Sequence, residues 1–441
     1  MTTSAPSGQE TAVADGATER ISPRALFRLV EFRHLLWTRF PAQWGDGVFQ
    51  AGLAGAVLFN PQRAADALTI AGGFAVLLLP YSLIAPFTGA LLDRWDRRRV
   101  LIIANALRAV AILCCAGGVA LGVGGTWLFM LALLVMAISR FAGSGLSAAL
   151  PHVVPERSIV TANALATTLG AVTAVFGGAC AIGLRALLGQ GNVGSGATTA
   201  IATVGSVVAA LVATRIPRGL LGPTRVDEPA DALAAVARGL VDGARAALRC
   251  PGVRAGFVAL LAHRAAFGIA LLLTVLLMRF SFTDAGPFKA GLTGLGQVAV
   301  LGGAGIVLAG YLTPRLVERF GRRRAIVGSL LLAALAQAGL GLPFLLPTVL
   351  IASFAVTSAG QVIKLCVDAS VQRDIGDESR GRVFALYDTL FNLTQVVAVT
   401  VAALLTPPDG HAPALLAGAV ALYLLGAAGF LRASRRADPA G

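Results

Sequence analysis

Long apolar segments alternate with short polar connections along most of the chain. Many of these segments approach 20 mostly apolar residues, which is enough to cross a bilayer as an α-helix. The short alternating segments of a membrane β-barrel would give a different pattern. The pattern predicts twelve membrane-spanning helices, at 35–59, 66–92, 100–121, 126–149, 163–187, 196–215, 254–280, 288–312, 324–345, 347–369, 382–406 and 412–433.

The composition agrees with this pattern. Hydrophobic residues make up 56% of the 441 residues, and charged residues make up only 13%, well below the roughly 25% that is usual in soluble domains. We therefore predict an all-α polytopic membrane protein.

Basic residues gather in every second connection. They include the cluster Arg94 to Arg99, seven arginines from Arg215 to Arg254, and the run from Arg315 to Arg324, whereas the opposite connections contain only four basic residues. Short loops rich in Lys and Arg stay on the cytoplasmic side. We therefore expect both termini to be cytoplasmic and the protein to lie in the inner (plasma) membrane. The net charge of +14 then belongs to loops beside the lipid bilayer, and no nucleic-acid partner is expected.

Two landmarks in the chain occur twice at nearly the same spacing. The run RRR at 97–99 recurs at 322–324, and PERSIVTANAL at 155–165 is matched by DESRGRVFALY at 377–387. The two offsets, 225 and 222, nearly agree. A parallel repeat of this kind occurs in some secondary transporters. The spacing predicts two pseudo-symmetric six-helix bundles.

The repeat also sets the expected domain limits. Residues 226–249 have apolar positions at helical spacing but are too polar to span a membrane, so we expect an amphipathic helix on the cytoplasmic surface. The expected organisation is a disordered cytoplasmic tail at 1–29, a bundle at 30–216, a linker containing the amphipathic helix at 217–253, a second bundle at 254–434 and a cytoplasmic tail at 435–441.

Several motifs carry a family resemblance. The pattern Gly89-x-x-x-Asp93-Arg94-x-x-Arg97-Arg98 resembles the signature loop of the major facilitator superfamily, and a weaker copy follows the eighth expected helix. The segments WGDGVFQAGL at 44–53, ANAL at 162–165 and RGRVFAL at 380–386 are similar to the branch of bacterial drug, macrolide and siderophore exporters. The resemblance covers residues 30–434.

The resemblance implies a function. A member of this branch would be a monomeric secondary transporter that exports a small organic compound in exchange for protons, by rocking its two halves. The fifth expected helix keeps the glycine pair of the antiporter motif, Gly177 and Gly178, without the preceding Gly-Pro. Proton-coupled uptake of a small organic anion is therefore an alternative, with a passive channel and a membrane-embedded enzyme as further ones.

The loop after the second expected helix has two interpretations. Its arginines, Arg94, Arg97 and Arg98, can simply hold the loop on the cytoplasmic side. The resemblance implies in addition a conformational gate, in which Gly89 permits close helix approach and Asp93 faces the amino end of the eleventh helix. A carboxylate is favourable at that end of a helix.

Ionisable side chains inside the first six spans are candidates for proton coupling, because they are costly there. Asp46 lies about 15 Å into the first helix. It either titrates as access alternates or forms a permanent ion pair beside Gly45 and Gly47. Arg140 resembles an arginine linked to proton transfer in the superfamily, and Arg140 or Arg108 could be the counter-charge of Asp46. For Arg108 we favour an alternative, in which its guanidinium extends toward the membrane surface.

The second six spans contain His263, Arg264, Gln361, Lys364 and Asn392 as candidate cavity residues. Lys364 and Asp368 are at i, i+4 spacing, which favours an internal ion pair. The lone His263 is either a proton-exchange group or a hydrogen-bonded helix contact. Cationic residues outnumber acidic ones within the spans, which hints at an anionic substrate.

The sequence gives no sign of catalytic or metal chemistry. The four histidines are scattered, and neither lysine lies in a phosphate-binding Gly-x-x-x-x-Gly-Lys-Ser/Thr loop. We therefore expect no cofactor, no metal and no enzymatic activity, with protons and a small molecule as the partners.

Overall fold

The computed structural model of the chain describes residues 26–58, 66–83, 96–155, 158–222 and 232–435. These residues form α-helices joined by short connections, and the β-bridge among them pairs Ala285 with Phe288. The prediction of an all-α chain is confirmed.

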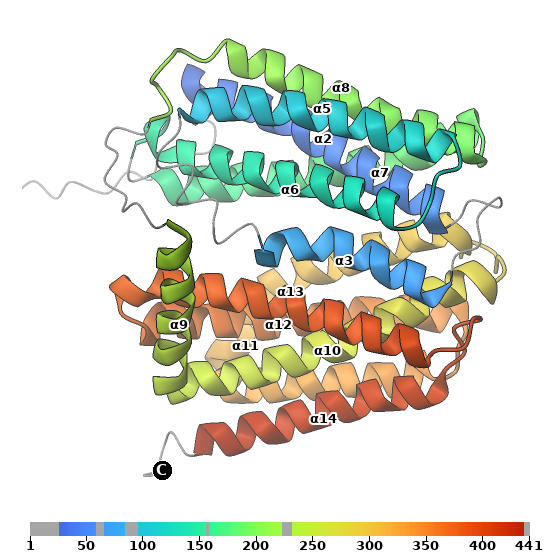
Figure 1. Cartoon of the computed structure of the whole chain (residues 1–441). Helices are drawn as coiled ribbons and strands as arrows, with labels where there is room; N and C mark the ends of the chain where they lie inside the picture. The colour runs from blue at the N-terminus through green and yellow to red at the C-terminus, as the bar shows by residue number, and fades with distance from the viewer. Residues whose placement is uncertain (1–25, 59–65, 84–95, 156–157, 223–231, 436–441) are drawn as a thin grey trace, which may run out of the picture.

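The helices form two groups that are consecutive in the sequence, except that α3 (Ala67–Leu83) lies apart from its sequence neighbours and packs beside α13 (Asp377–Leu405) of the second group (Figure 1). The first group contains α2 (Val30–Leu58), α3 (Ala67–Leu83), α5 (Arg97–Ala120), α6 (Thr126–Ala149), the short helix η1 (Leu150–His152), α7 (Ile159–Leu188) and α8 (Asn192–Thr214). The second contains α10 (Pro251–Phe280), α11 (Gly291–Ala336) with its continuation η3 (Gln337–Gly341), α12 (Leu346–Asp374), α13 (Asp377–Leu405) and α14 (Pro413–Arg435). Between the groups in the sequence, α9 covers Ala232–Arg249.

These helices match the expected spans. Helix α11 covers most of the eighth expected span and, with η3, most of the ninth. The two spans are separate helical segments, because Gly321 between them has φ 78° and ψ 154°. The second expected span, 66–92, is described only as far as Leu83. Nine helices of the described chain are long and apolar enough to cross a membrane.

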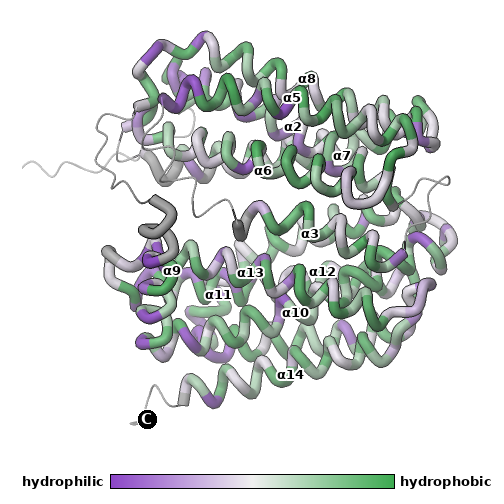
Figure 2. Tube along the Cα trace, viewed as in Figure 1, coloured by the Kyte–Doolittle hydropathy of each residue, from purple (hydrophilic) through white to green (hydrophobic). Residues whose placement is uncertain are grey.

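Helix surfaces are consistent with a lipid environment. On α5 the exposed side chains include Ile103, Leu107 and Val110, while Asn105 and Arg108 are buried on the other side. Apolar residues therefore cover the outside of the helices as well as the packed interior (Figure 2). A soluble protein would expose polar residues on such a face.

Helix α2 packs closely between α7 and α8. A Cβ atom at Gly47 would overlap the carbonyl oxygen of Ala174 on α7, and one at Gly205 on α8 would overlap the carbonyl oxygen of Pro41. Small residues let membrane helices approach closely. The close approach at Gly47 agrees with the packing interpretation of the glycines beside Asp46.

Helix α9 lies across one end of the molecule, where α5 begins and α12 ends (Figure 1). It packs against α13, and Asp242 is 3.7 Å from Arg382. This end carries Arg97–Arg99 and Arg322–Arg324, and we call it the arginine-rich end.

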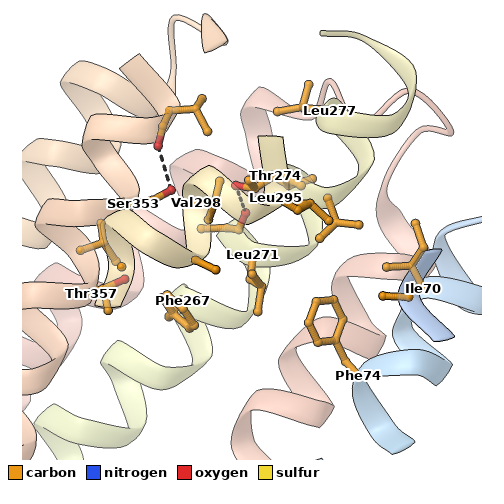
Figure 3. Close-up of a pocket in the computed structure, with 18 of the residues that line it drawn as sticks. Ile70, Phe74, Phe267, Leu271, Thr274, Leu277, Leu295, Val298, Ser353 and Thr357 are labelled. Atoms are coloured by element: carbon orange, nitrogen blue, oxygen red, sulfur yellow. Dashed lines mark hydrogen bonds between the residues drawn. The ribbon is translucent and has the colours of Figure 1, made fainter. Parts of the chain in front are cut away.

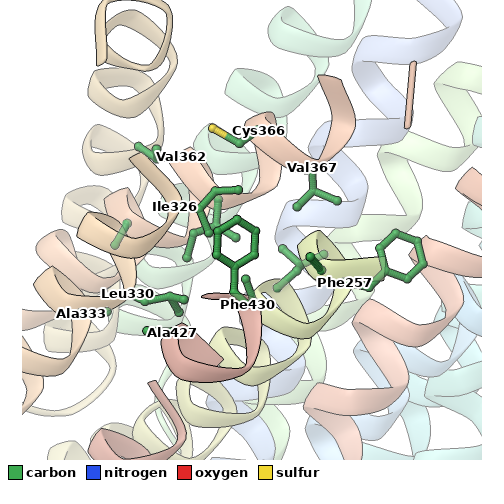
Figure 4. Close-up of a cluster of buried hydrophobic side chains, with 14 of the residues drawn as sticks. Phe257, Ile326, Leu330, Ala333, Val362, Cys366, Val367, Ala427 and Phe430 are labelled. Atoms are coloured by element: carbon green, nitrogen blue, oxygen red, sulfur yellow. The ribbon is translucent and has the colours of Figure 1, made fainter. Parts of the chain in front are cut away.

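The packed cores show where the two groups meet. At the arginine-rich end each group has its own apolar cluster, around Leu101 and Leu146 in the first group and around Phe257, Ile326 and Phe430 in the second (Figure 4). At the opposite end one cluster contains residues of both groups, with Leu272 of α10 and Val399 of α13 packed among residues of α2, α3 and α5 to α8. Among the described residues, a common core therefore joins the two helix groups at the end opposite the arginine-rich end.

Candidate functional site: a cavity between the two helix groups

A cavity of about 480 Å³ lies beside this common core. Helices α2, α3 and α6 of the first group line it together with α10, α11, α12 and α14 of the second. Figure 3 shows lining residues of α3, α10, α11 and α12. Its volume falls within the range of roughly 300–1,000 Å³ that is usual for small-molecule sites.

The cavity wall is mainly apolar. Its aromatic residues include Phe74 and Phe267, and its polar side chains are Gln50, Thr274, Gln337, Ser353 and Thr357. The hydroxyl of Thr274 donates to the carbonyl of Ala270 at 2.8 Å, and that of Ser353 donates to the carbonyl of Val349 at 2.8 Å. Both hydroxyls can still accept a hydrogen bond. Such a wall suits a largely apolar compound with a few polar groups.

Asp46 lies outside this cavity wall, in a buried polar network of the first group. Its carboxylate is 3.3 Å from the guanidinium of Arg108 and accepts a hydrogen bond of 2.5 Å from Ser139. Arg108 also donates to Ser206 at 2.9 Å and to the carbonyl of Ala42 at 3.0 Å. The network joins α2, α5, α6 and α8.

Arg108 therefore corrects one expectation. Its side chain is 1% exposed and does not extend toward the membrane surface. Its guanidinium instead has an acid, two hydroxyls and a carbonyl as partners inside the first group. Arg140, the other candidate counter-charge, is half-buried next to Ser139 on α6.

His263 makes a helix contact in the second group. Its Nε2 is 3.1 Å from the carbonyl oxygen of Val356 on α12, and its ring lies 5.2 Å from that of Tyr423 on α14. A Cβ at Gly360 would overlap the imidazole, so this glycine makes room for it. The geometry agrees with the hydrogen-bonded interpretation.

Arg264 has aromatic neighbours. Its guanidinium carbon lies 3.9 Å from the ring centre of Phe391 on α13 and 5.4 Å from that of Phe267. Its Nε is buried without a hydrogen-bond partner. Phe267 also lines the cavity, so Arg264 lies just beyond the cavity wall.

The predicted ion pair on α12 is present. The ammonium of Lys364 is 2.8 Å from Asp368, and it lies 5.3 Å from the ring centre of Tyr387. Gln361 is half-buried one turn earlier on the same helix.

Asn392 is buried on α13 and donates to the carbonyl of Asp388 at 2.8 Å. Asp388 itself is an exposed carboxylate inside an expected span, and the sequence analysis missed it. Its position within the span 382–406 was the signal that could have identified it.

The expected gate is described only in part, because Gly89, Asp93 and Arg94 lie outside the described residues. Arg97 donates to the carbonyls of Ala148 and Leu221 at 3.1 and 3.2 Å. Arg98 donates to those of Ile216 and Thr214 at 2.6 and 2.7 Å. Cations are favourable near the carbonyls at helix ends, and these bonds hold the start of α5 to the ends of α6 and α8.

His152 lies beside Arg97. Its Nδ1 is 3.5 Å from the guanidinium of Arg97. In the second group the equivalent of Arg97 is Arg322, which bonds to Ser370 and lies 3.9 Å from Asp374.

Comparison with known proteins decides the family. The family model described as Major Facilitator Superfamily matches residues 42–399, with a second match at 265–439. The chain belongs to the major facilitator superfamily. It is therefore a multi-pass membrane transporter, as the cavity between two helix groups suggests, and members of the superfamily bind small molecules within the membrane.

Two curated relatives agree with this assignment. Proteins described as uncharacterized MFS-type transporters of Mycobacterium bovis and Mycobacterium tuberculosis are each 43% identical to the chain over 422 residues, which is 94% of either sequence. They support a transporter of this superfamily and name no substrate.

Solved structures show the same fold. The nucleoside transporter NupG aligns with a TM-score of 0.69 and 14% identity, covering 92% of this chain and 99% of NupG. A mutant form of a peptide transporter POT aligns with a TM-score of 0.69 and 15% identity, covering 94% of this chain and 95% of that one.

Proposed function

We propose that this transporter exports a small, largely apolar organic compound in exchange for protons, by alternating access. The observation that carries the proposal is the cavity beside the common core, because both helix groups line it. A site between two groups can change the side on which it opens when the groups rock.

The positions of the apolar cores indicate which side of the membrane the cavity faces in this conformation. Among the residues that the structure describes, the groups share a core at the opposite end and have separate cores at the arginine-rich end. If the arginine-rich end is cytoplasmic, as basic loops favour, the conformation is closed to the outside. A compound would then enter from the cytoplasm, and rocking would open the common core.

The Asp46–Arg108 pair is the proposed proton-coupling group. The pair is buried, so protonation of Asp46 would leave Arg108 without its counter-charge, at a cost that depends on how far water reaches the pair. In the proposed cycle, rocking changes the side from which water and protons reach the pair, and this couples the two fluxes.

The cavity can be tested with a glycine variant. Gly73 lines the cavity, and a Cβ there would have no heavy atom within 4 Å, so Gly73→Leu should fill the cavity without a backbone clash. Gly310 on α11 is equally open but does not line the cavity, and Gly310→Leu is the matched control.

Proton flux should be measured in inverted membrane vesicles with a panel of antibiotics, siderophores and small organic acids. We expect a panel compound to drive proton flux through the wild type and the control, and we expect Gly73→Leu to lose most of it. Equal flux in Gly73→Leu and the wild type, or no compound-driven flux above protein-free vesicles, would contradict the proposal.

A further inference from the structure

Two arginines occupy equivalent positions in the two helix groups. Arg39 on α2 and Arg264 on α10 are separated in the sequence by the same interval as Arg97 and Arg322. Each lies on the first helix of its group. The repeat that relates the halves therefore also relates these two cations.

Both arginines lack an acidic partner among the described residues. Each is half-buried, and the Nε of each is buried without a hydrogen-bond partner. By contrast, Arg108 pairs with Asp46 and Lys364 pairs with Asp368. Taking a charge out of water without a counter-charge is costly. Ionisable residues inside membrane spans are functional candidates for this reason.

The two side chains are held by equivalent helices. Arg264 lies over Phe391 of α13. Arg39 lies against α7, where a Cβ at Gly170 would be 3.2 Å from its Nε. Helix α7 begins within the first copy of the second repeated landmark, and α13 begins with the second copy. A guanidinium stacked on an aromatic face keeps its edge available for an oxyanion.

Each arginine shares a helix face with the cavity wall. Gln50 follows Arg39 by eleven residues, and Val275 follows Arg264 by eleven, and both Gln50 and Val275 line the cavity. Eleven residues are about three turns, so each pair lies on one side of its helix. Phe267, one turn from Arg264, connects that arginine directly to the cavity wall.

We propose that Arg39 and Arg264 together bind the oxyanion group of an amphiphilic compound whose apolar part occupies the cavity. This inference rests on the proposed function and adds the substrate class to it. Because each helix group contributes one arginine, an anion bound to both favours conformations in which the groups approach at the arginine-rich end. The anion would thus bias the alternating-access equilibrium as well as bind.

Binding of radiolabelled decanoate to the full-length protein in lipid nanodiscs tests the proposal, with empty nanodiscs subtracted. We expect saturable binding that unlabelled decanoate and decyl phosphate displace, and that decanol and decyltrimethylammonium displace poorly. The stronger of the two anionic competitors identifies the preferred oxyanion, carboxylate or phosphate.

Arginine variants localise the binding. Arg39→Gln and Arg264→Gln should each weaken decanoate binding by about tenfold, and Arg264→Lys should retain part of it. Arg315 is also stacked on an aromatic ring, 3.9 Å from that of Tyr311, but it is exposed elsewhere on α11. Arg315→Gln is therefore the matched control and should bind as the wild type does.

Thermal unfolding without ligand shows whether a variant binds decanoate weakly because it lacks the arginine or because its structure is destabilised. Loss of an unpaired buried charge should leave the melting temperature of Arg264→Gln equal to or above that of the wild type. Wild-type affinity in both glutamine variants, or equal displacement by decanol and decanoate, would overturn the inference. The proposed function would survive that result if Gly73→Leu still blocked flux of a neutral compound.

Discussion

At the scale of single residues, the partners of a charged side chain say more about its role than its depth in a membrane span does. Asp46 and Arg108 are both deep, yet neither lines the cavity, and their charges are satisfied by each other and by Ser139. Sequence analysis identified both as candidates. It could not tell which face of its helix each occupies once the helices pack, so Arg108 was wrongly expected to extend outward.

The pair allows a test that separates structure from coupling. Asp46→Asn leaves Arg108 buried without a counter-charge and should destabilise the protein by about 3–5 kcal/mol, measured by thermal unfolding in detergent. The double variant Asp46→Asn/Arg108→Gln removes both charges and should recover most of that stability. Neither variant should show proton-coupled flux.

The double variant is the decisive one. If the pair were only structural, the recovered protein would transport with the wild-type dependence on pH, and the coupling role of Asp46 would be refuted.

The pair of arginines shows what the sequence could have revealed. The repeat offset was available from the two RRR runs, and applying it to every charged residue in the spans relates Arg39 to Arg264. The aromatic stack of Arg264 on Phe391 was not available, because it joins α10 to α13, which are far apart in the sequence.

At the scale of elements, the hydrophobic pattern predicted the helices well. Most expected spans agree with an observed helix to within one residue at each end they overrun. A stretch of about 20 apolar residues in lipid must form a helix, because only then are its backbone hydrogen bonds satisfied within the segment. The cavity could not be predicted in the same way. It depends on how α2 and α3 pack beside α10, α11 and α12, and the pattern of any one helix does not contain that information.

Gly321 is a glycine whose role the neighbouring sequence could have indicated. It precedes the second RRR run, and its φ of 78° and ψ of 154° let α11 turn back as a second helix. This backbone conformation is nearly restricted to glycine.

Gly321→Ala should therefore destabilise the protein by about 1–3 kcal/mol, because alanine is strained in that conformation. Gly328 is helical and open on the same element, and Gly328→Ala should be neutral or stabilising. Thermal unfolding of the detergent-solubilised proteins measures both. Equal melting temperatures for the two variants would show that the turn at Gly321 is not strained by a side chain.

At the scale of the whole molecule, the central claim is that the common core opens and closes. Within the described chain, this core is the cluster that joins the two groups at the opposite end, and Val399 on α13 is 1% exposed within it. Ala419 on α14 is 0% exposed but belongs to the core of the second group alone. Alternating access should expose the first position and leave the second buried.

Labelling by a membrane-impermeant maleimide tests this directly, with Val399→Cys and Ala419→Cys each placed in a background without the five native cysteines. In proteoliposomes with an imposed proton gradient and a transported compound, Val399→Cys should label faster than in their absence, while Ala419→Cys should stay protected. Continued flux with Val399→Cys protected under every condition would contradict the account.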